Sequence, residues 1–185
     1  MNINKATNAK LVGEIKLHTE HDKKLIFNAA STITKSELKD NRGRVYFIVL
    51  DDEIHKIGGS QAKGGIQATI SPYLGGFAKG MSPRTYCVWN YMFQKLKLGH
   101  TINIYFILAP SFEIMIPSMY NNKLKITTAD YHDIESDCIQ EYIKEENQYP
   151  YLNIQESGRH WIDTGLLEGY PGIIETNKIT KDDNE

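Results

Sequence analysis

The stretch RVYFIVLDDEIHKIGGS, residues 44–60, contains two groups suited to acid–base chemistry, the phenol of Tyr46 and the amine of Lys56. It is typical of two short apolar strands joined by an acidic turn. Such a hairpin brings the phenol and the amine to matching depths. A neighbouring cation favours phenolate, so we expect Lys56 to lower the pKa of Tyr46. A phenolate can then accept a proton from water as a general base.

Other parts of the chain supply what phosphodiester hydrolysis needs besides a base. The segment TADYHDIESDCIQEYIKEEN, residues 128–147, reads as an acidic amphipathic helix. A carboxylate on a helix can hold one hard divalent cation and leave water positions open. Cations in the glycine-rich loops can neutralise the charge of a phosphorane-like transition state. These residue types predict hydrolysis of a phosphodiester with one metal ion.

The acidic residues are distributed unevenly along the chain. The formal net charge of −2 argues neither for nor against a nucleic-acid partner. From Ile54 to Phe112, however, there is no Asp or Glu. The basic residues of that span are Lys56, Lys63, Lys79, Arg84, Lys95 and Lys97. A region without carboxylates can present a positive face to a polyanion, and the alternative is a set of ordinary solvated lysines.

Length and composition define the class of protein. A chain of 185 residues with 41% hydrophobic and 24% charged residues predicts one soluble domain with its own core. No apolar run is long enough to span a membrane, and the first residues lack the apolar centre of a signal peptide, so we expect a cytoplasmic protein without a membrane partner. Cys87 and Cys138 lack metal-ligand spacing and are expected to be buried thiols.

The expected elements alternate between strands and helices. Strands are expected at 45–50, 53–57 and 101–109, the last of them central in the sheet, and an edge strand at 111–118. A short helix is expected within 61–74, a longer one from Pro83 after the N-cap Ser82 to Gly99, and a third over 128–147. Residues 9–17 fit a strand or a helix, and 31–40 fit a helix.

This order predicts an α/β (α+β) fold in which helices flank an antiparallel sheet. We expect residues 43–150 to form the core domain. Residues 1–42 then form an N-terminal extension, and residues 151–185 form a C-terminal extension whose end is expected to be disordered.

Three motifs resemble the GIY-YIG nuclease superfamily. RVY, with Tyr46, and KIG, with Lys56, resemble the two parts of its hairpin signature, and lysine in the second part is a variant of a small restriction-endonuclease branch. TYCVWNYMFQKLKLGHTINIYFILAP resembles the helix and strand that follow in this branch. IESDCIQEYIKEENQYP resembles its metal-binding helix.

The resemblance implies a GIY-YIG-like sheet and a metal-dependent DNA endonuclease, in particular a type II restriction enzyme. Tyr46 would then be the general base, Lys56 the group that tunes it, and Glu135 the ligand of Mg²⁺ or Mn²⁺. Asp137 and Glu141 are alternative ligands. The partner would be double-stranded DNA, and symmetric cleavage by so small a chain suggests a homodimer.

Two positions depart from the family pattern. The family carries an arginine near the place of Gln67, but residues 61–83 contain none, and Gly59 stands where the restriction branch tends to have histidine. Lys63, Lys79 and Arg84 are the candidate replacements for the arginine, and Arg84 is preferred for its planar fork. If none replaces it, the alternative is a nucleic-acid-binding protein on the same fold that has lost cleavage.

Several residues are expected to contact DNA. They are Lys63, Gln67, Lys79, Arg84 and Arg159. Arg159 lies in SGRHW, where it can read guanine while Trp161 stacks or wedges. The alternative for this motif is that the indole packs on the core.

Overall fold

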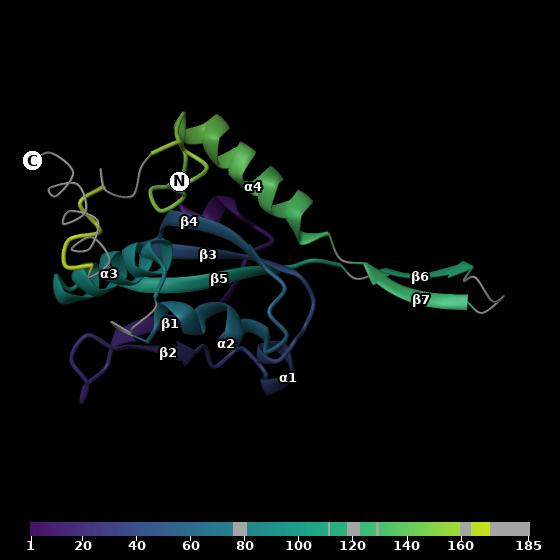
Figure 1. Ribbon diagram of the computed structural model, residues 1–185, viewed down its shortest axis with the longest axis horizontal. Helices are drawn as coiled ribbons and strands as arrows, with labels where there is room; N and C mark the ends of the chain where they lie inside the picture. Colours follow the sequence, from purple (N-terminus) through teal and green to yellow (C-terminus); the bar gives the residue numbers. More distant parts are fainter. Residues whose placement is uncertain (76–80, 111, 118–122, 129, 160–163, 171–185) are drawn as a thin grey trace, which may run out of the picture.

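The computed structural model describes residues 1–75, 81–110, 112–117, 123–128, 130–159 and 164–170 (Figure 1). Its main sheet has five antiparallel strands in the order β2-β1-β5-β3-β4. These are β1 (Lys10–Leu17), β2 (Leu25–Ala29), β3 (Arg44–Leu50), β4 (Glu53–Ser60) and β5 (Ile102–Leu108). The α+β fold with helices flanking an antiparallel sheet is confirmed, and so is the central place of β5.

Within the described residues, four α-helices flank this sheet, and a short 3₁₀ turn, Ile3–Lys5, precedes it. They are α1 (Lys35–Leu38), α2 (Gly65–Ile70), α3 (Pro83–Lys97) and α4 (Tyr131–Glu146). A 3₁₀ turn, Ser71–Tyr73, continues α2. The expected start of α3 is confirmed, because the Ser82 side chain accepts a hydrogen bond from the backbone of Thr85. No helix in the described ranges is long and apolar enough to cross a membrane.

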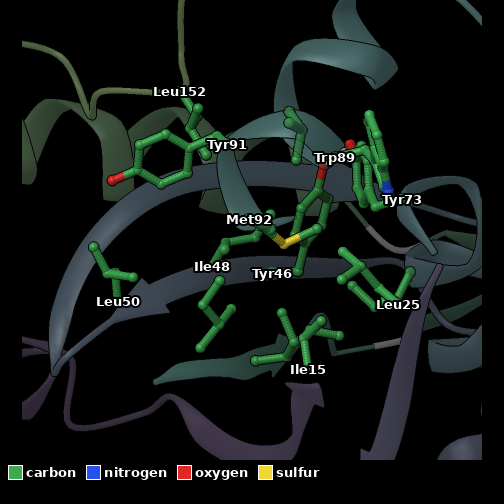
Figure 2. Packing of buried hydrophobic residues seen from close by; sticks show 14 of the residues in the cluster. Ile15, Leu25, Tyr46, Ile48, Leu50, Tyr73, Trp89, Tyr91, Met92 and Leu152 are labelled. Atoms are coloured by element: carbon green, nitrogen blue, oxygen red, sulfur yellow. Dashed lines mark hydrogen bonds between the residues drawn. The ribbon is translucent and has the colours of Figure 1, made fainter. Parts of the chain in front are cut away.

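The β3–β4 hairpin turns at Asp51 and Asp52, both of which adopt positive φ, as a two-residue hairpin turn requires. Alternating residues of β3 then enter two cores. Tyr46, Ile48 and Leu50 join a core with α2 and α3, which Figure 2 shows together with Ile15 and Met92. Val45, Phe47 and Val49 join a second core with α4. The catalytic candidates on this hairpin therefore lie between two helical layers.

The strands that flank β5 come from both sides of the expected boundary at residues 42 and 43. β1 pairs with β5 on the side away from β3, and β2 pairs with β1. Residues 10–17 therefore form a strand, one of the two alternatives that their pattern allowed. The β2 strand had not been predicted, and the pairing of β1 with β5 depends on contacts far apart in sequence.

A separate two-stranded sheet consists of β6 (Phe112–Pro117) and β7 (Lys123–Thr128). The expected edge strand at 111–118 is confirmed over residues 112–117, although it pairs with β7 in a sheet of its own rather than with the main sheet. Figure 1 shows this hairpin extending away from the main sheet. The reason is local: β7 supplies all six of the partners of β6, which leaves β6 paired within its own hairpin.

Both cysteines are thiols within helices, as expected. Cys87 is fully buried, and burial raises the pKa of its thiol to about 12. Cys138 is only half-buried, and burial raises its pKa to about 11. Neither therefore carries the thiolate that reactive cysteines use at neutral pH.

Candidate active site

Tyr46 lies in the middle of the site, with only 4% of its surface exposed. It stands opposite Gly58 on β4, and a Cβ added at Gly58 would lie 2.6 Å from the tyrosine hydroxyl. The glycine of the second motif therefore leaves the room that the phenol occupies. The hydroxyl groups of Tyr46 and Tyr73 lie 2.8 Å apart and share a hydrogen bond. Figure 2 shows the two side chains approaching each other from β3 and the turn after α2.

The expected lowering of the pKa of Tyr46 is wrong for the protein without substrate. Burial raises the pKa of Tyr46 well above that of a free phenol, and the neighbouring Tyr73 adds to this effect. The charge of Arg84 lowers it and that of Glu135 raises it, but burial outweighs both. Without substrate Tyr46 is therefore a neutral phenol that must lose its proton before it can act as a base.

Lys56 is buried on the same side of the hairpin, with 1% of its surface exposed. It pairs with Ile48 and is thus the diagonal neighbour of Tyr46. Its Nζ donates a hydrogen bond to the backbone oxygen of Leu152 at 3.4 Å. Burial, aided by the charge of Arg84, lowers the pKa of Lys56 to about 8, against the opposite pull of Glu156 and Glu135. Near physiological pH the amine of Lys56 can therefore lose its proton and take it up again.

Arg84 reaches this group from the first turn of α3. Its positive charge acts on the pKa of three neighbours, lowering those of Tyr46, Tyr73 and Lys56. One guanidinium nitrogen donates a weak hydrogen bond to Gln155 at 3.4 Å. In the described structure this cation has no carboxylate partner within salt-bridge distance. The charge of the preferred replacement for the family arginine therefore acts on the phenol.

Glu135 lies on α4 against the other side of β4. A Cβ added at Gly59 would collide with its carboxylate and with the ring of Tyr131. Gly59 thus lets α4 come close to the strand, which gives a physical reason for glycine where the restriction branch tends to have histidine. The carboxylate is 4.0 Å from Nδ1 of His132, and 21% of the side chain is exposed. Its charge raises the pKa values of Tyr46, Tyr73 and Lys56.

The alternative ligands lie elsewhere on α4. Asp137 and Glu141 line a cavity of about 600 Å³ with Lys5 and Cys138. Among the described residues, no three His, Cys, Asp or Glu side chains gather closely enough to form a metal cluster. One partly exposed carboxylate is nevertheless the kind of site that Mg²⁺ accepts, since this ion keeps several waters and binds one or two carboxylates together with substrate phosphate. The donors present fit such an ion through Glu135.

The other expected DNA contacts lie apart from Tyr46. Lys63 and Gln67 are exposed and line a pocket of about 570 Å³ with Lys35 and Lys39 of the α1 region. Arg159 covers the ring of Tyr151, 5.4 Å from its centre, and donates a hydrogen bond of 2.7 Å to the Tyr151 carbonyl. Lys79 and Trp161 lie outside the described residues, as does the end of the chain that was expected to be disordered.

Three residues of the site had no signal in the sequence. Tyr73, bonded to Tyr46, follows a helix too short to predict its direction. Asn153 is fully buried and extends the edge of β4, because its amide accepts from the nitrogen of Ile57 and donates to its oxygen. Arg44, also buried, donates to the Thr69 hydroxyl and to the carbonyls of Asp40, Arg42 and Ala62. It thereby fixes α2 against β3.

Comparison with known proteins adds two solved structures. The restriction endonuclease HPY188I in complex with product DNA is 21% identical, over 81% of this chain and 84% of that chain, with a TM-score of 0.48. A mutant of bacteriophage T4 EndoII is 18% identical, over 82% of this chain and 95% of that chain, with a TM-score of 0.49. No family model and no curated protein matches the chain. The residues of the site itself therefore carry the functional argument.

Proposed function

We propose that this protein is a metal-dependent DNA endonuclease that hydrolyses phosphodiesters with Tyr46 as the general base, in the manner of a type II restriction enzyme. One observation carries the proposal. Tyr46 and Lys56 of the β3–β4 hairpin, Arg84 of α3 and Glu135 of α4 converge at the outer strand β4. A base, a second proton-exchanging group, a cation and a metal-ligating carboxylate are the parts that this chemistry requires. The resemblance of the hairpin to the GIY-YIG signature agrees with it.

Tyr46 and Lys56 act as a pair. With one proton removed, the pair exists either as phenol with neutral amine or as phenolate with ammonium, and these two forms have the same total charge. The lowered pKa of Lys56, about 8, sets where the first proton leaves. The phenolate form can accept the proton of the attacking water. In the active form the amine of Lys56 thus holds the proton that Tyr46 has lost, and Lys56 is not a permanent cation.

Arg84 stabilises the phosphate. A guanidinium presents donors in a planar fork that matches two phosphate oxygens. Its place in the first turn of α3 adds the positive end of the helix dipole to the same oxygens. The cation thereby stabilises the charge that develops on the phosphate during attack, which is worth about 10²–10³ in rate for one such donor.

Glu135 holds the divalent ion, Mg²⁺ or Mn²⁺. When bound, that ion supplies Lewis-acid stabilisation of the phosphate and of the leaving oxygen. Glu135 contributes one carboxylate. It approaches β4 at Gly59, on the face of the sheet opposite to the face on which Tyr46 and α3 pack. The close approach that Gly59 allows keeps this carboxylate at the strand. The two sides of the phosphate would then each face positive charge.

The proposed partner is double-stranded DNA. Arg84 contacts the reacting phosphate, whereas Lys63, Gln67, Lys79 and Arg159 contact flanking nucleotides. Two symmetric cuts require two active sites, so we extend the proposal to a homodimer. Sedimentation of the protein free and on DNA tests this extension, and a monomer in both states would contradict it.

Cleavage of supercoiled plasmid tests the endonuclease. With Mg²⁺ the protein should convert plasmid to nicked or linear DNA, and EDTA should abolish the reaction. Tyr46→Phe removes only the hydroxyl and should lower the rate about 10²–10⁴-fold with DNA binding unchanged. Tyr105→Phe is the matched control, a half-buried tyrosine on the adjacent strand β5 that points into the other core, and it should cut normally. Equal cutting by Tyr46→Phe and wild type would refute the role of Tyr46.

The second candidate function is a nucleic-acid-binding protein that does not cleave. The raised pKa of Tyr46 and the glutamine at the place of the family arginine favour it. It predicts DNA binding with a steep salt dependence and no nicking under any divalent ion. The plasmid assay separates the two functions.

A further inference from the structure

We propose that a cavity of about 970 Å³ between β4, α3, the end of α4 and residues 148–159 binds a nucleotide, a nucleobase together with its phosphate. The proposal rests on the proposed function, because the nucleotide would most naturally belong to the DNA strand that enters the Tyr46 site. The shared chemistry is that of a planar aromatic ring with an anionic group. A free mononucleotide and a base of a polynucleotide both satisfy it.

Aromatic side chains line the cavity. Tyr151 is 39% exposed, which leaves one side of the residue open to solvent. Its ring centre lies 5.3 Å from that of Tyr91 and 6.4 Å from that of His55. Base–aromatic stacking is tolerant of sequence, because every base has a π-face. Tyr151 is therefore the exposed aromatic side chain of the cavity on which a base can stack, beside or in place of the Arg159 guanidinium that lies 5.4 Å from its ring centre.

His55 reaches the cavity because of an irregularity in β4. The β3–β4 register steps from Ile48 opposite Lys56 to Val49 opposite Ile54, so His55 is the extra residue of a β-bulge. Its Nδ1 shares a hydrogen bond of 2.7 Å with the hydroxyl of Tyr91. No other hydrogen bond of the His55 ring exists within the described residues, which leaves Nε2 for the edge of a base. Burial lowers the pKa of His55, so the imidazole is neutral and can donate or accept.

Two cations at the cavity can contact a phosphate. Lys95 lies over the Tyr91 ring, 5.6 Å from its centre, and Arg159 lies over the Tyr151 ring. Within the described ranges neither is paired with a carboxylate. The acids of the same cavity, Glu53 and Glu146, both pair with the N-terminal amine, at 2.9 and 3.1 Å. One amine thus faces two carboxylates, and with Lys95 and Arg159 the formal charge of these groups is +1, with the two side-chain cations beside the aromatic rings, which favours an anionic ligand.

The cavity adjoins the candidate active site along two elements. His55 and Lys56 are neighbours on β4, one in the cavity and the other beside Tyr46. Tyr91 follows Arg84 by two turns of α3, about 10 Å along the helix axis. Residues 151–159 border both places, through Gln155 at Arg84 and Tyr151 at His55. A DNA strand held by Arg84 can thus place a nearby base in the cavity.

The test measures binding rather than cleavage. The full chain is titrated with dAMP by calorimetry, and with a ten-nucleotide single strand containing 2-aminopurine by fluorescence. Tyr151→Ala should weaken binding of the probe about tenfold, from the usual worth of one stacked base. Tyr151→Phe keeps the ring and should bind as the wild type does. Binding of both probes supports the proposal, and binding of the strand alone or of dAMP alone identifies the source of the nucleotide.

Lys95 and Lys97 provide a matched pair on one helix. Each ammonium lies over an aromatic ring, Lys95 over Tyr91 and Lys97 over Phe93 at 5.7 Å, but only Lys95 lines the cavity. Lys95→Ala should weaken binding of both probes several-fold, and Lys97→Ala should not. If neither Tyr151→Ala nor Lys95→Ala changes the affinity of either probe, the proposal is wrong. A wild type that binds dAMP but never cuts DNA would instead refute the endonuclease and leave the nucleotide site standing.

Discussion

Two regions that follow β4 in the chain offer a cation for the phosphate. They differ in their distance from Lys56 in sequence, in the exposure of the cation and in its effect on the pKa of Tyr46. Lys63 lies before α2, seven residues after Lys56, and is exposed in a pocket with other lysines. Arg84 lies 28 residues after Lys56, at the start of α3, and is half-buried. Yet it is Arg84 whose charge acts on Tyr46, Tyr73 and Lys56. Nearness in sequence is thus a poor guide to which cation approaches the phenol.

The difference arises from how the two helices are fixed. Arg44, buried under α2, donates to Thr69 and to the Ala62 carbonyl, so α2 is held with Lys63 and Gln67 outward. The Ser82 cap starts α3 so that Arg84 stands one turn before buried Tyr86, Cys87 and Val88. An arginine at the first turn of a helix can face a reacting phosphate while the rest of the helix packs on the core.

The largest expected effect concerns the metal ligand. Here two carboxylates of α4 are compared, as Arg84 and Lys63 are compared above. Glu135→Ala should lower cleavage by about 10³-fold or more, since it removes the carboxylate that holds the ion and with it several kcal/mol of transition-state stabilisation. Residual DNA binding should lose its dependence on Mg²⁺. Both are measured with a fixed DNA over a Mg²⁺ series.

Glu141→Ala is the control for that change. Glu141 lies on the same helix but lines the cavity with Lys5, whereas the carboxylate next to Gly59 is that of Glu135. It should cut at the wild-type rate. Normal cutting by Glu135→Ala together with a loss in Glu141→Ala would transfer the metal site to the other side of α4.

The hairpin, the central strand and the long helices could be predicted because their signals are local. Tyr46 and Lys56 share one hairpin, β5 is an unbroken apolar run, and Ser82 and Gly99 delimit α3. Asn153 and Ile57 are 96 residues apart, and nothing in either stretch indicates the bond between them. The pKa of Tyr46 was predicted in the wrong direction because burial depends on packing that α2 and α3 supply.

The next effect tests the comparison directly. Arg84→Ala should lower the cleavage rate at saturating DNA by about 10²–10³-fold, with a much smaller change in affinity, because the guanidinium is needed most in the transition state. Lys63→Ala should cut normally once DNA saturates it and should only weaken binding and reduce the salt slope by about one. Rates and affinities measured separately for both variants decide between them. If the two results are exchanged, Lys63 is the phosphate cation and Arg84 a surface contact.

The smallest expected effect is a dependence of the cleavage rate on pH. It tests whether the buried Lys56, unlike the exposed lysines such as Lys63, takes part in the ionisation of Tyr46. The Tyr46–Lys56 pair must lose one proton to become active, and the lowered pKa of Lys56, about 8, sets where it does so. Below that pH the inactive, fully protonated pair dominates. The single-turnover rate should therefore rise about tenfold for each pH unit up to about 8 and then level off.

Lys56→Met shows whether this rise belongs to the pair. Methionine fills the buried space but cannot take the phenol proton, so Tyr46 must ionise alone, at its own raised pKa. The variant should be slow at pH 8, and its rate should continue to rise beyond pH 9, where the wild type is level. Lys97→Met, a lysine at the end of α3 that does not line the nucleotide cavity, should keep the wild-type profile. A wild-type rate that falls above pH 8 would mean that Lys56 works as a cation, and the proton of Tyr46 would then have to leave through Tyr73, its hydrogen-bond partner at 2.8 Å.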